Sequence, residues 1–267
     1  TGSEAVLKSL RIAKAISKKD LIVSVSGSWH GSLDQFLFYP TKSKKIESMS
    51  SGISKFYSNN LKIIPYNDII NSNKILQKLK SKIAAIIIEP IQGCLPSEES
   101  KKYLLYLQKF CDQNKIILIF DETITGVRTY EGSVHRKFKL SPSISIFGKC
   151  IGGGAPISVV GINKKISQKM NKLKKKIYFG GTFSGNSTST FICYETIKYI
   201  MNNKKIIKEL NFKTNYIKKE INQFLKKNNL KAKIYSFESM LRIVFSNKII
   251  TNRLQRDFLE KKQNSNI

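Results

Sequence analysis

Unbroken runs of apolar residues constrain the fold of this chain more than any other feature of its sequence. Six runs are predicted to be strands, and they cover residues 21–27, 61–66, 83–90, 116–122, 143–148 and 156–162. Four of the six are apolar throughout, which is typical of strands that are buried on both faces of a parallel sheet. Helices are predicted around 73–82 and 98–114, so strands and helices alternate. This alternation predicts an α/β fold with a mostly parallel central sheet flanked by helices.

The pattern changes beyond residue 186. Long stretches there carry apolar residues at helical spacing, and they precede two predicted strands, KAKIYS and SMLRIVFS. We therefore predict a large domain over residues 1–203 and part of a small C-terminal α+β domain over residues 204–267. At the other end, TGSEAVLKSLRIAKAI is helical by its fourth residue and has neither a Met nor a strand before it. We expect a chain that is truncated at its N-terminus.

The formal net charge of +29 is the most unusual property of the composition. A charge of this size favours nucleic acids or anionic membrane surfaces as partners. The lysines, however, are spread along the chain together with Asn and Ile, and they form no concentrated patch with Arg and aromatic residues between them. We therefore expect solvated helix faces rather than a specific nucleic-acid site.

The four cysteines indicate the compartment. They are scattered, form no CxxC pair, and are accompanied by only two histidines. This usage argues against a zinc site and against a disulfide scaffold, and it fits a reducing cytosol. There is also no apolar run of transmembrane length and no signal peptide. The expectation is a cytoplasmic protein without a membrane partner.

Chemically useful side chains follow the predicted strands. In order along the chain they are Trp29 and His30, Glu89 and Gln92, Asp121, and Lys149. Ligands of doubly wound sheets bind beyond the carboxyl ends of the strands, which lie at one edge. The sequence therefore predicts that an aromatic ring, an acid and a lysine converge at this edge.

Such a trio suits pyridoxal 5'-phosphate. The amine of Lys149 can form a Schiff base with the aldehyde and, once displaced by substrate, can move a proton. A buried Asp121 can pair with the pyridine nitrogen, and Trp29 can stack on the ring. The helix that starts at TGSEA offers the backbone N–H groups of Gly2 and Ser3 to the phosphate. No metal site is predicted.

Each of these residues also has an ordinary structural interpretation. Lys149 is one of many lysines and can be a simple strand-end charge. Asp121 can cap a helix, Trp29 can belong to the core, and His30 can be a histidine with all its hydrogen bonds made in a turn. Only the set as a whole favours the chemical interpretation.

Six motifs support it further, and they occur in this order along the chain: TGSEA (1–5), WHG (29–31), EPIQG (89–93), DETITGVR (121–128), FGKCIGGGAP (147–156) and GGTFSGN (180–186). In order and approximate spacing they resemble the motifs of class-III pyridoxal-phosphate aminotransferases. The branch that they resemble best is that of the glutamate-1-semialdehyde aminomutases. The resemblance implies a fold-type-I transferase fold, and a chain that lacks both termini of the family.

The resemblance implies a role for each matching position. Lys149 is implied as the Schiff-base lysine and Asp121 as the partner of the pyridine nitrogen. Trp29 matches the stacking aromatic residue with His30 as its neighbour, and Gly2 and Ser3 match the pair that binds the phosphate. These roles make pyridoxal 5'-phosphate the expected cofactor.

Three further positions bear on assembly and branch. Thr182 resembles the threonine that reaches the phosphate of the neighbouring subunit, which implies a homodimer with shared sites. Arg128 and Glu89 match positions that we interpret as structural supports. Cys94 replaces the acid that follows EPIQG in many members, and this departure favours the aminomutase-like branch over the ω-aminotransferase branch.

The expected activity is transfer of an amino group to or from a small amino, keto or amino-aldehyde substrate. It takes place either within one molecule, as in an aminomutase, or between two, as in an aminotransferase, and both versions use Lys149 and Asp121. Two alternatives stay open at this point. One is a truncated or degenerate homologue that acts only as a dimerisation partner. The other is a basic protein that binds nucleic acid.

Overall fold

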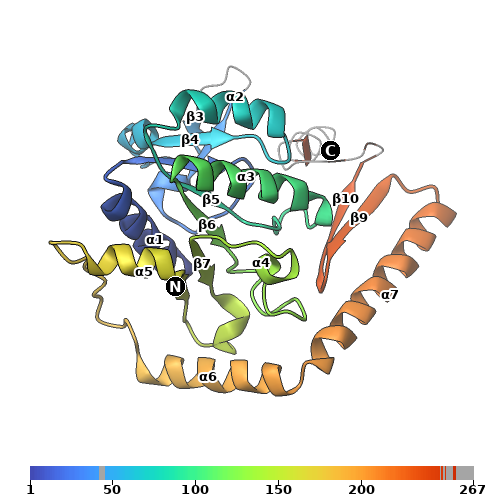
Figure 1. The fold of residues 1–267 in the computed structure, drawn as a ribbon. Helices are drawn as coiled ribbons and strands as arrows, with labels where there is room; N and C mark the ends of the chain where they lie inside the picture. The colour runs from blue at the N-terminus through green and yellow to red at the C-terminus, as the bar shows by residue number, and fades with distance from the viewer. Residues whose placement is uncertain (42–45, 247, 249, 251–254, 257–267) are drawn as a thin grey trace.

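A six-stranded sheet forms the centre of the molecule in the computed structural model, which describes residues 1–41, 46–246, 248, 250, 255 and 256 (Figure 1). Its strands are β1 (Leu21–Val25), β4 (Leu61–Ile64), β5 (Ile83–Ile88), β6 (Ile117–Asp121), β7 (Ile144–Phe147) and β8 (Val159–Ile162). Their spatial order is β4-β1-β5-β6-β7-β8. All neighbours are parallel except β7 and β8, which pair antiparallel. The predicted mostly parallel α/β fold is confirmed, and each strand lies inside its predicted run.

The central strands are buried on both faces, as their unbroken apolar runs predicted. On β5, Ile86 and Ile88 belong to the core cluster that contains side chains of α2 (Ile69–Leu79) and α3 (Lys101–Asn114). The alternate residues Ala85 and Ile87 belong to a second cluster with α1 (Gly2–Ser17) and α5 (Lys164–Asn171). Helices therefore cover both faces of the sheet and exclude water from them.

Local capping sets where the first two helices begin. The side chain of Thr1 accepts a hydrogen bond from the backbone N–H of Glu4, and the backbone amine of Thr1 donates to the Glu4 carboxylate, which completes a capping box at the start of α1. At α2, the Asp68 side chain accepts from the backbone N–H of Asn71 at 2.9 Å. This cap starts the helix at Ile69, before the predicted boundary at residue 73.

Several short elements were not predicted from the sequence. They are the hairpin of β2 (Phe38–Pro40) and β3 (Ile46–Ser48), the helix α4 (Val134–Lys137), and the 3-10 turns η1 (Asp34–Phe36), η2 (Lys55–Asn60), η3 (Glu98–Ser100) and η4 (Lys149–Gly152). Each spans too few residues to show a clear hydrophobic period. The turn η4 matters for function because it begins at Lys149.

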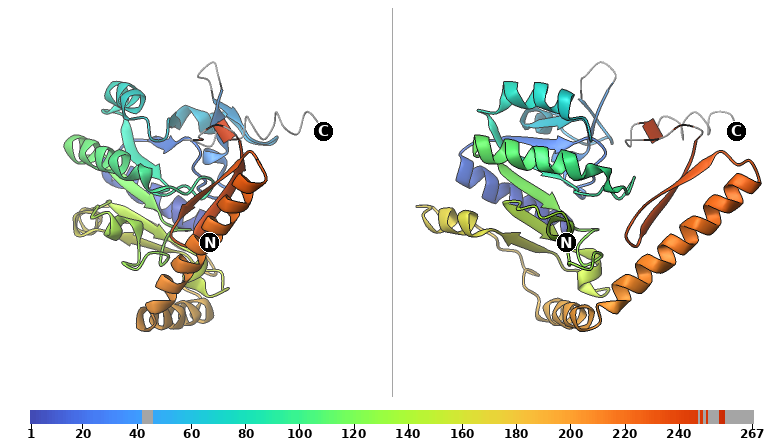
Figure 2. Two further views of the ribbon diagram at one scale, coloured as in Figure 1. Left: turned by 90° about the vertical axis from the view of Figure 1, so that its right-hand side faces the viewer. Right: turned by 45° about the vertical axis from the view of Figure 1, so that its right-hand side comes forward.

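The C-terminal part extends away from the sheet. After α6 (Ser187–Asn202), the long helix α7 (Lys205–Lys227) leads to the antiparallel pair β9 (Ala232–Phe237) and β10 (Met240–Phe245) (Figure 2). These elements agree with the predicted small α+β unit. A hydrogen bond from Arg128 to Ser239 Oγ, 3.2 Å long, ties the hairpin to the rest of the chain. The boundary at 203/204 stays a prediction, and much of 247–267 lies outside the described residues.

In the part of the chain that the structure describes, no helix combines the length and the apolar character needed to cross a membrane.

The double-sided burial of β5 gives a direct test of the fold. Replacing Ile87, which is fully buried, by Ala should lower the free energy of unfolding by about 2–5 kcal/mol, because buried methylenes are lost and a cavity is left behind. Ile70 is 69% exposed, and Ile70→Ala should change the same quantity by less than about 0.5 kcal/mol. Urea unfolding followed by circular dichroism measures both. Equal losses in the two variants would contradict the placement of β5.

Candidate active site

The register of the sheet brings the predicted acid and the predicted lysine to neighbouring positions. Asp121, at the end of β6, pairs with Ile146 of β7, and Lys149 follows three residues further along. On the other side, Phe120 pairs with Ile88, so Glu89 leaves β5 next to Asp121. The backbone positions of Glu89, Asp121 and Lys149 therefore lie at the carboxyl ends of neighbouring strands, and the convergence of their side chains with Trp29 stays a prediction.

Asp121 and His30 form a buried pair. His30 Nδ1 lies 2.8 Å from Asp121 Oδ2, and both side chains are almost fully buried. Burial raises the pKa of the Asp121 carboxyl, but the hydrogen bond and charge of His30 and the hydrogen bonds from Thr123 outweigh it, so the pKa lies below its usual range. An ionised carboxylate only accepts hydrogen bonds, so Nδ1 of His30 is the donor. Asp121 is thus a negative charge fixed at the strand end.

Thr123 is a site residue that sequence reasoning missed. Its backbone N–H donates to Asp121 Oδ1 at 3.1 Å, and its hydroxyl donates to the same oxygen at 2.5 Å. The signal was a Thr two residues after an Asp, a spacing at which backbone and hydroxyl donors commonly reach the carboxylate. Together with His30, Thr123 holds both oxygens of Asp121 in place.

The methyl group of Thr123 is also the point at which three parts of the site meet. A Cβ added at Gly2 would lie 3.3 Å from Thr123 Cγ2, and one added at Gly148 would lie 3.0 Å from the same atom. The start of α1 and the residue before Lys149 therefore both pack closely against the turn that follows Asp121. The helix N-terminus, the acid and the lysine are assembled around one side chain.

The loop that carries Trp29 and His30 is fixed against α1. Gly31 adopts a φ of +82°, and a Cβ there would lie 2.2 Å from Ser3 Oγ, so only glycine suits this position. The Ser3 hydroxyl accepts a hydrogen bond from the backbone N–H of Ser32 at 3.1 Å. The loop after β1 thus reaches the predicted phosphate-binding residues.

Lys149 has an unusual backbone. Its φ is +49°, a conformation that non-glycine residues rarely adopt and that concentrates at functional sites. The Lys149 side chain is exposed. Lys18 and Lys115 share it, but as the C-caps of helices, whereas Lys149 follows a strand. The turn η4 therefore holds Lys149 in a strained geometry at the edge where Asp121 lies.

Glu89 binds the backbone of the loop that carries Trp29 and His30. Its Oε1 accepts from the backbone N–H of Trp29 at 2.7 Å, and its Oε2 accepts from the backbone N–H of Gly93 at 3.2 Å. Burial, and next the charge of Asp121, raise the pKa of Glu89 to about 7. Trp29 itself is 48% exposed, which contradicts the alternative that it is a core residue. A buried carboxylate thus holds the backbone of Trp29, whose side chain is partly exposed.

Gln92, which the sequence placed at the same edge without a role, also holds this loop. The side chain is fully buried and donates to the backbone carbonyl of Ser26 at 2.8 Å. Arg128, expected to be a support, donates from Nε to the carbonyl of Ile124 at 2.8 Å. Both residues thus bind backbone segments.

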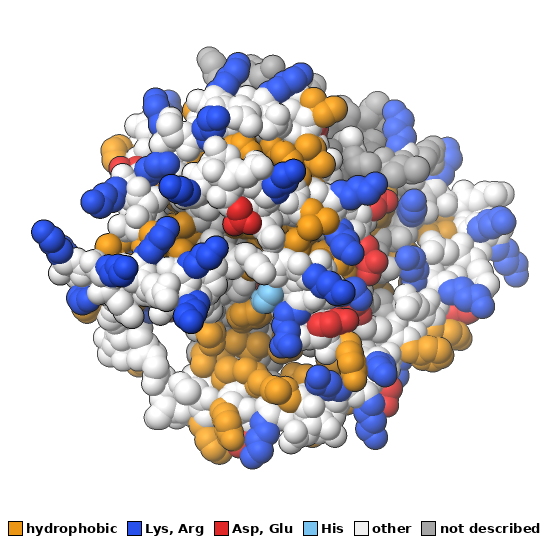
Figure 3. All heavy atoms as spheres, viewed as in Figure 1, with side chains coloured by type: hydrophobic (Ala, Val, Ile, Leu, Met, Phe, Trp, Pro, Cys, Tyr) orange, Lys and Arg blue, Asp and Glu red, His pale blue; other side chains and the backbone are white. Residues whose placement is uncertain are grey.

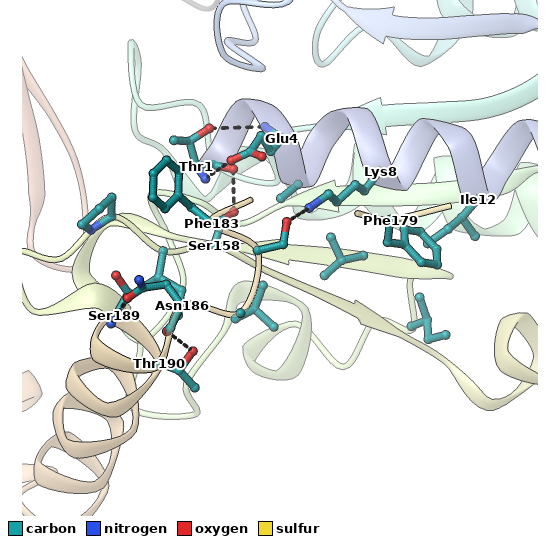
Figure 4. Close-up of a pocket in the computed structure, with 18 of the residues that line it drawn as sticks. Thr1, Glu4, Lys8, Ile12, Ser158, Phe179, Phe183, Asn186, Ser189 and Thr190 are labelled. Carbon is teal, nitrogen blue, oxygen red and sulfur yellow. Dashed lines mark hydrogen bonds and ion pairs between the residues drawn. The ribbon is translucent and has the colours of Figure 1, made fainter. Parts of the chain in front are cut away.

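Thr182 lies in the exposed loop that leads into α6. The neighbouring Gly181 lies beside Glu4 of α1, since a Cβ at Gly181 would be 3.9 Å from Glu4 Oε1. The loop also lines a pocket between α1 and β8 (Figure 4). The predicted contact of Thr182 with a neighbouring subunit stays a prediction.

Two observations indicate that the site is shaped for a polar, phosphorylated group. His30 Nε2 is buried, and among the described residues it has no hydrogen-bond partner. The first-turn N–H groups of α1 have no acceptors within the helix, and the side chain of Thr1 satisfies only that of Glu4. These unpartnered donors therefore fit a ligand with an anionic end.

The raised pKa of Glu89 predicts a pH dependence. Its folded-state pKa of about 7 lies above the ordinary value of 4.5, so its contribution to stability is complete below pH 4.5 and is lost as the pH rises through 7. Glu89→Gln removes this titration. The difference in free energy of unfolding, wild type minus variant, should therefore fall between pH 4.5 and 7. A difference that is constant across this range in urea titrations would contradict the burial of Glu89.

Comparison with known proteins finds relatives in sequence and in fold. A glutamate-1-semialdehyde 2,1-aminomutase of Methanococcus maripaludis is 31% identical over 94% of this chain, and one of Thermosipho melanesiensis is 34% identical over 87%. The chain spans 58% and 55% of these relatives' lengths.

Among solved structures, an omega-transaminase from Sphaerobacter thermophilus matches with a TM-score of 0.84 and 20% identity. The match covers 93% of this chain and 59% of the transaminase. A transaminase with PLP bound matches with a TM-score of 0.81, 21% identity and coverage of 91% and 58%.

The solved structures are only 20% and 21% identical to this chain, so these matches show a shared fold and no more. The family model of class-III aminotransferases matches residues 1–265, which is nearly the whole chain. With the ordered motifs, the sheet topology and the assembled strand ends, this match establishes the family. The chain belongs to the class-III aminotransferases.

Proposed function

We propose that this chain carries the cofactor site of a pyridoxal-phosphate enzyme that transfers amino groups. The observation that carries the proposal is the meeting of α1, the Asp121 turn and the Lys149 turn at Thr123. Family membership and the PLP-bound structural neighbour support the same cofactor. When bound, pyridoxal 5'-phosphate supplies an aldehyde that reacts with amines and a pyridinium ring that accepts electrons.

Lys149 is the residue that we assign to the aldehyde. Its exposed amine stands at the site edge on a strained turn, so the backbone fixes where the side chain begins. After a substrate amine takes its place, the free amine of Lys149 can accept a proton from the substrate carbon and return it at a neighbouring atom. Binding and proton transfer thus fall to one side chain.

We assign Asp121 as the partner of the pyridine nitrogen of the cofactor. A carboxylate whose pKa is held low stays ionised when it is buried, and it therefore favours a proton on a nitrogen placed against it. His30 donates to Oδ2 of Asp121 and Thr123 donates to Oδ1, and these two hydrogen bonds keep the carboxylate from rotating. In this account His30 is a positioning residue that acts through Asp121.

The remaining contacts orient the ligand. The N–H groups of Gly2 and Ser3 at the start of α1 suit a phosphate dianion, which the helix dipole also favours. The half-exposed ring of Trp29 offers a flat surface for stacking. Glu89 keeps that ring in place through the Trp29 backbone.

Within the family we favour the aminomutase reaction, in which an amine leaves one carbon of an amino-aldehyde and is added to the adjacent carbon. The supporting observations are the relatives at 31% and 34% identity and the replacement of the usual acid by Cys94. None of the four cysteines, all of which the structure describes, forms a disulfide; this fits a reducing compartment, and we place the activity in the cytoplasm.

We also propose a homodimer in which Thr182 completes the partner's phosphate site. The loop 180–186 and α6 support it, because their aromatic side chains are exposed to an extent that is unusual for a monomer: Phe183 83%, Phe191 65%, Tyr194 59% and Tyr199 62%. A second copy of the chain is the natural cover for a surface next to a shared site.

Cofactor retention tests the assignment of Lys149. After incubation with pyridoxal 5'-phosphate and dialysis, the wild-type protein should keep the visible absorbance of the bound cofactor. Lys149→Ala should lose or shift that band, because the side chain that reacts with the aldehyde is absent. Lys102→Ala, which removes an exposed lysine on α3, is the matched control and should behave as wild type. A band that persists unchanged in Lys149→Ala would overturn the assignment.

Mixing two variants tests the shared site. Lys149→Ala and Thr182→Ala should each bind the cofactor poorly as homodimers. After co-refolding, each mixed dimer should regain one intact site, since Lys149 of one subunit then meets Thr182 of the other. Binding that stays at the sum of the separate variants would show that Thr182 acts within its own chain or not at all.

A further inference from the structure

The turn of the hairpin β9–β10 carries an unusual residue. Phe237 pairs with Met240, so Glu238 and Ser239 form the turn. Glu238 adopts a φ of +49°. In hairpin turns of this length the first residue commonly has a positive φ, and glycine, asparagine or aspartate usually occupies it. A glutamate at this position indicates that its side chain has a role of its own.

Both oxygens of the Glu238 carboxylate have a partner. Lys137 Nζ at the end of α4 donates to Oε1, and Asn211 Nδ2 of α7 donates to Oε2. The Glu238 side chain is only 10% exposed. A carboxylate that is buried to this extent needs a positive partner, and removal of that partner is costly. Lys137 therefore fixes the hairpin turn to α4, and Asn211 fixes it to α7.

Apolar contacts hold the hairpin in the same position. Phe237 is 2% exposed and belongs to the core cluster that contains side chains of α3. Its ring centroid lies 6.2 Å from that of Phe138, the residue that follows Lys137. In Figure 3, acidic and basic side chains lie together over the region between α4 and the hairpin. Packing and charge thus dock the hairpin turn at one place.

Arg128 links the docked turn to the candidate site. Its Nη1 donates to Ser239 Oγ at 3.2 Å, and its Nε donates to the backbone carbonyl of Ile124 at 2.8 Å. Ile124 lies three residues after Asp121. The hairpin turn therefore contacts, through one side chain, the segment 121–128 that begins with the predicted partner of the ring nitrogen.

The same segment is also linked to the turn that carries Lys149. The carbonyl of Gly126 accepts a hydrogen bond from the thiol of Cys150 at 3.1 Å, and Cys150 follows Lys149 in η4. A displacement of segment 121–128 would therefore move both the acid and the start of the lysine turn.

We propose that Glu238 and Lys137 are positioning residues of the cofactor site. They dock the hairpin turn so that Arg128 holds segment 121–128 in place. The proposal rests on the proposed function, in which Asp121 and Lys149 contact the cofactor. Because glycine adopts a positive φ without strain, Glu238→Gly keeps the turn and removes only the carboxylate. This variant separates the charge of Glu238 from the shape of the turn.

Hydrogen exchange in the protein without cofactor tests the link directly. The backbone N–H groups of Thr123 and Gly126 donate hydrogen bonds within segment 121–128. In Glu238→Gly both amides should exchange about tenfold faster than in wild type, because the segment opens more often. Lys137→Met, which removes the charge but keeps the apolar part of the side chain, should have the same effect.

Cofactor binding shows whether the link reaches the site. In both variants the Kd for pyridoxal 5'-phosphate, measured from the visible band, should rise by about three- to tenfold. The pH at which this band shifts should also rise. A displaced Asp121 holds the proton of the ring nitrogen less firmly, and the nitrogen bonded to Lys149 then keeps its own proton to higher pH. A residue that only stabilises the fold would leave this midpoint unchanged.

Glu98→Gln is the matched control. Glu98 Oε1 lies 3.9 Å from the same Lys137 Nζ, but its side chain is 64% exposed. Exposed ion pairs contribute little, so amide exchange and the Kd should stay within about twofold of wild type. The double variant of Glu238→Gly and Lys137→Met should bind cofactor within about twofold of the weaker single variant, since the two residues act as a pair.

Two results would overturn the proposal. One is amide exchange in Glu238→Gly equal to that in wild type. The other is a lowered free energy of unfolding with an unchanged Kd and an unchanged midpoint, which would make the pair merely structural. A wild type that binds no cofactor would reject the proposed function instead, and exchange would still decide whether Glu238 positions segment 121–128. Circular dichroism establishes that each variant is folded.

Discussion

Burial of both faces of β5 and β6 is the constraint on which the rest of the structure depends. Helices cover Ile86 and Ile88 on one side and Ile87 on the other, so polar chemistry is confined to the ends of these strands. Parallel strands end at one edge, and Glu89 and Asp121 consequently lie next to each other. The two neighbouring carboxyl groups differ in their pKa values. Burial and the charge of Asp121 raise the pKa of Glu89, while His30 and Thr123 keep Asp121 ionised.

Close packing then converts this edge into a site. Thr123 binds Asp121 through two donors, and its methyl group contacts both the start of α1 and the residue before Lys149. A change at Thr123 would therefore disturb the acid, the helix N-terminus and the lysine turn together. This coupling explains how residues from four separate motifs form one arrangement.

Much of this could be predicted from the sequence, and the exceptions have physical reasons. The strands were visible because their apolar runs are unbroken, and Trp29, His30, Asp121 and Lys149 were noticed because each follows a predicted strand. Thr123 and Gln92 were not recognised as supports, since their roles depend on contacts across the sheet that no local spacing reveals. The hairpin β2–β3 and the turn η4 are too short for periodicity, and the early start of α2 follows from a single cap at Asp68. The pocket beside β8 depends on segment 178–184 returning to α1, which only the tertiary structure shows.

Lys149 and Asp121 are the residues around which we propose that two copies of this chain build each cofactor site. The most direct test of this proposal is to incubate the protein with pyridoxal 5'-phosphate, reduce it with borohydride, digest it and locate the pyridoxyl group by mass spectrometry. The account predicts modification of Lys149 in preference to the other lysines, and a marked drop in Asp121→Ala, which leaves the ring nitrogen without its partner. Modification spread over many exposed lysines, with Lys149 no more reactive than the rest, would contradict it.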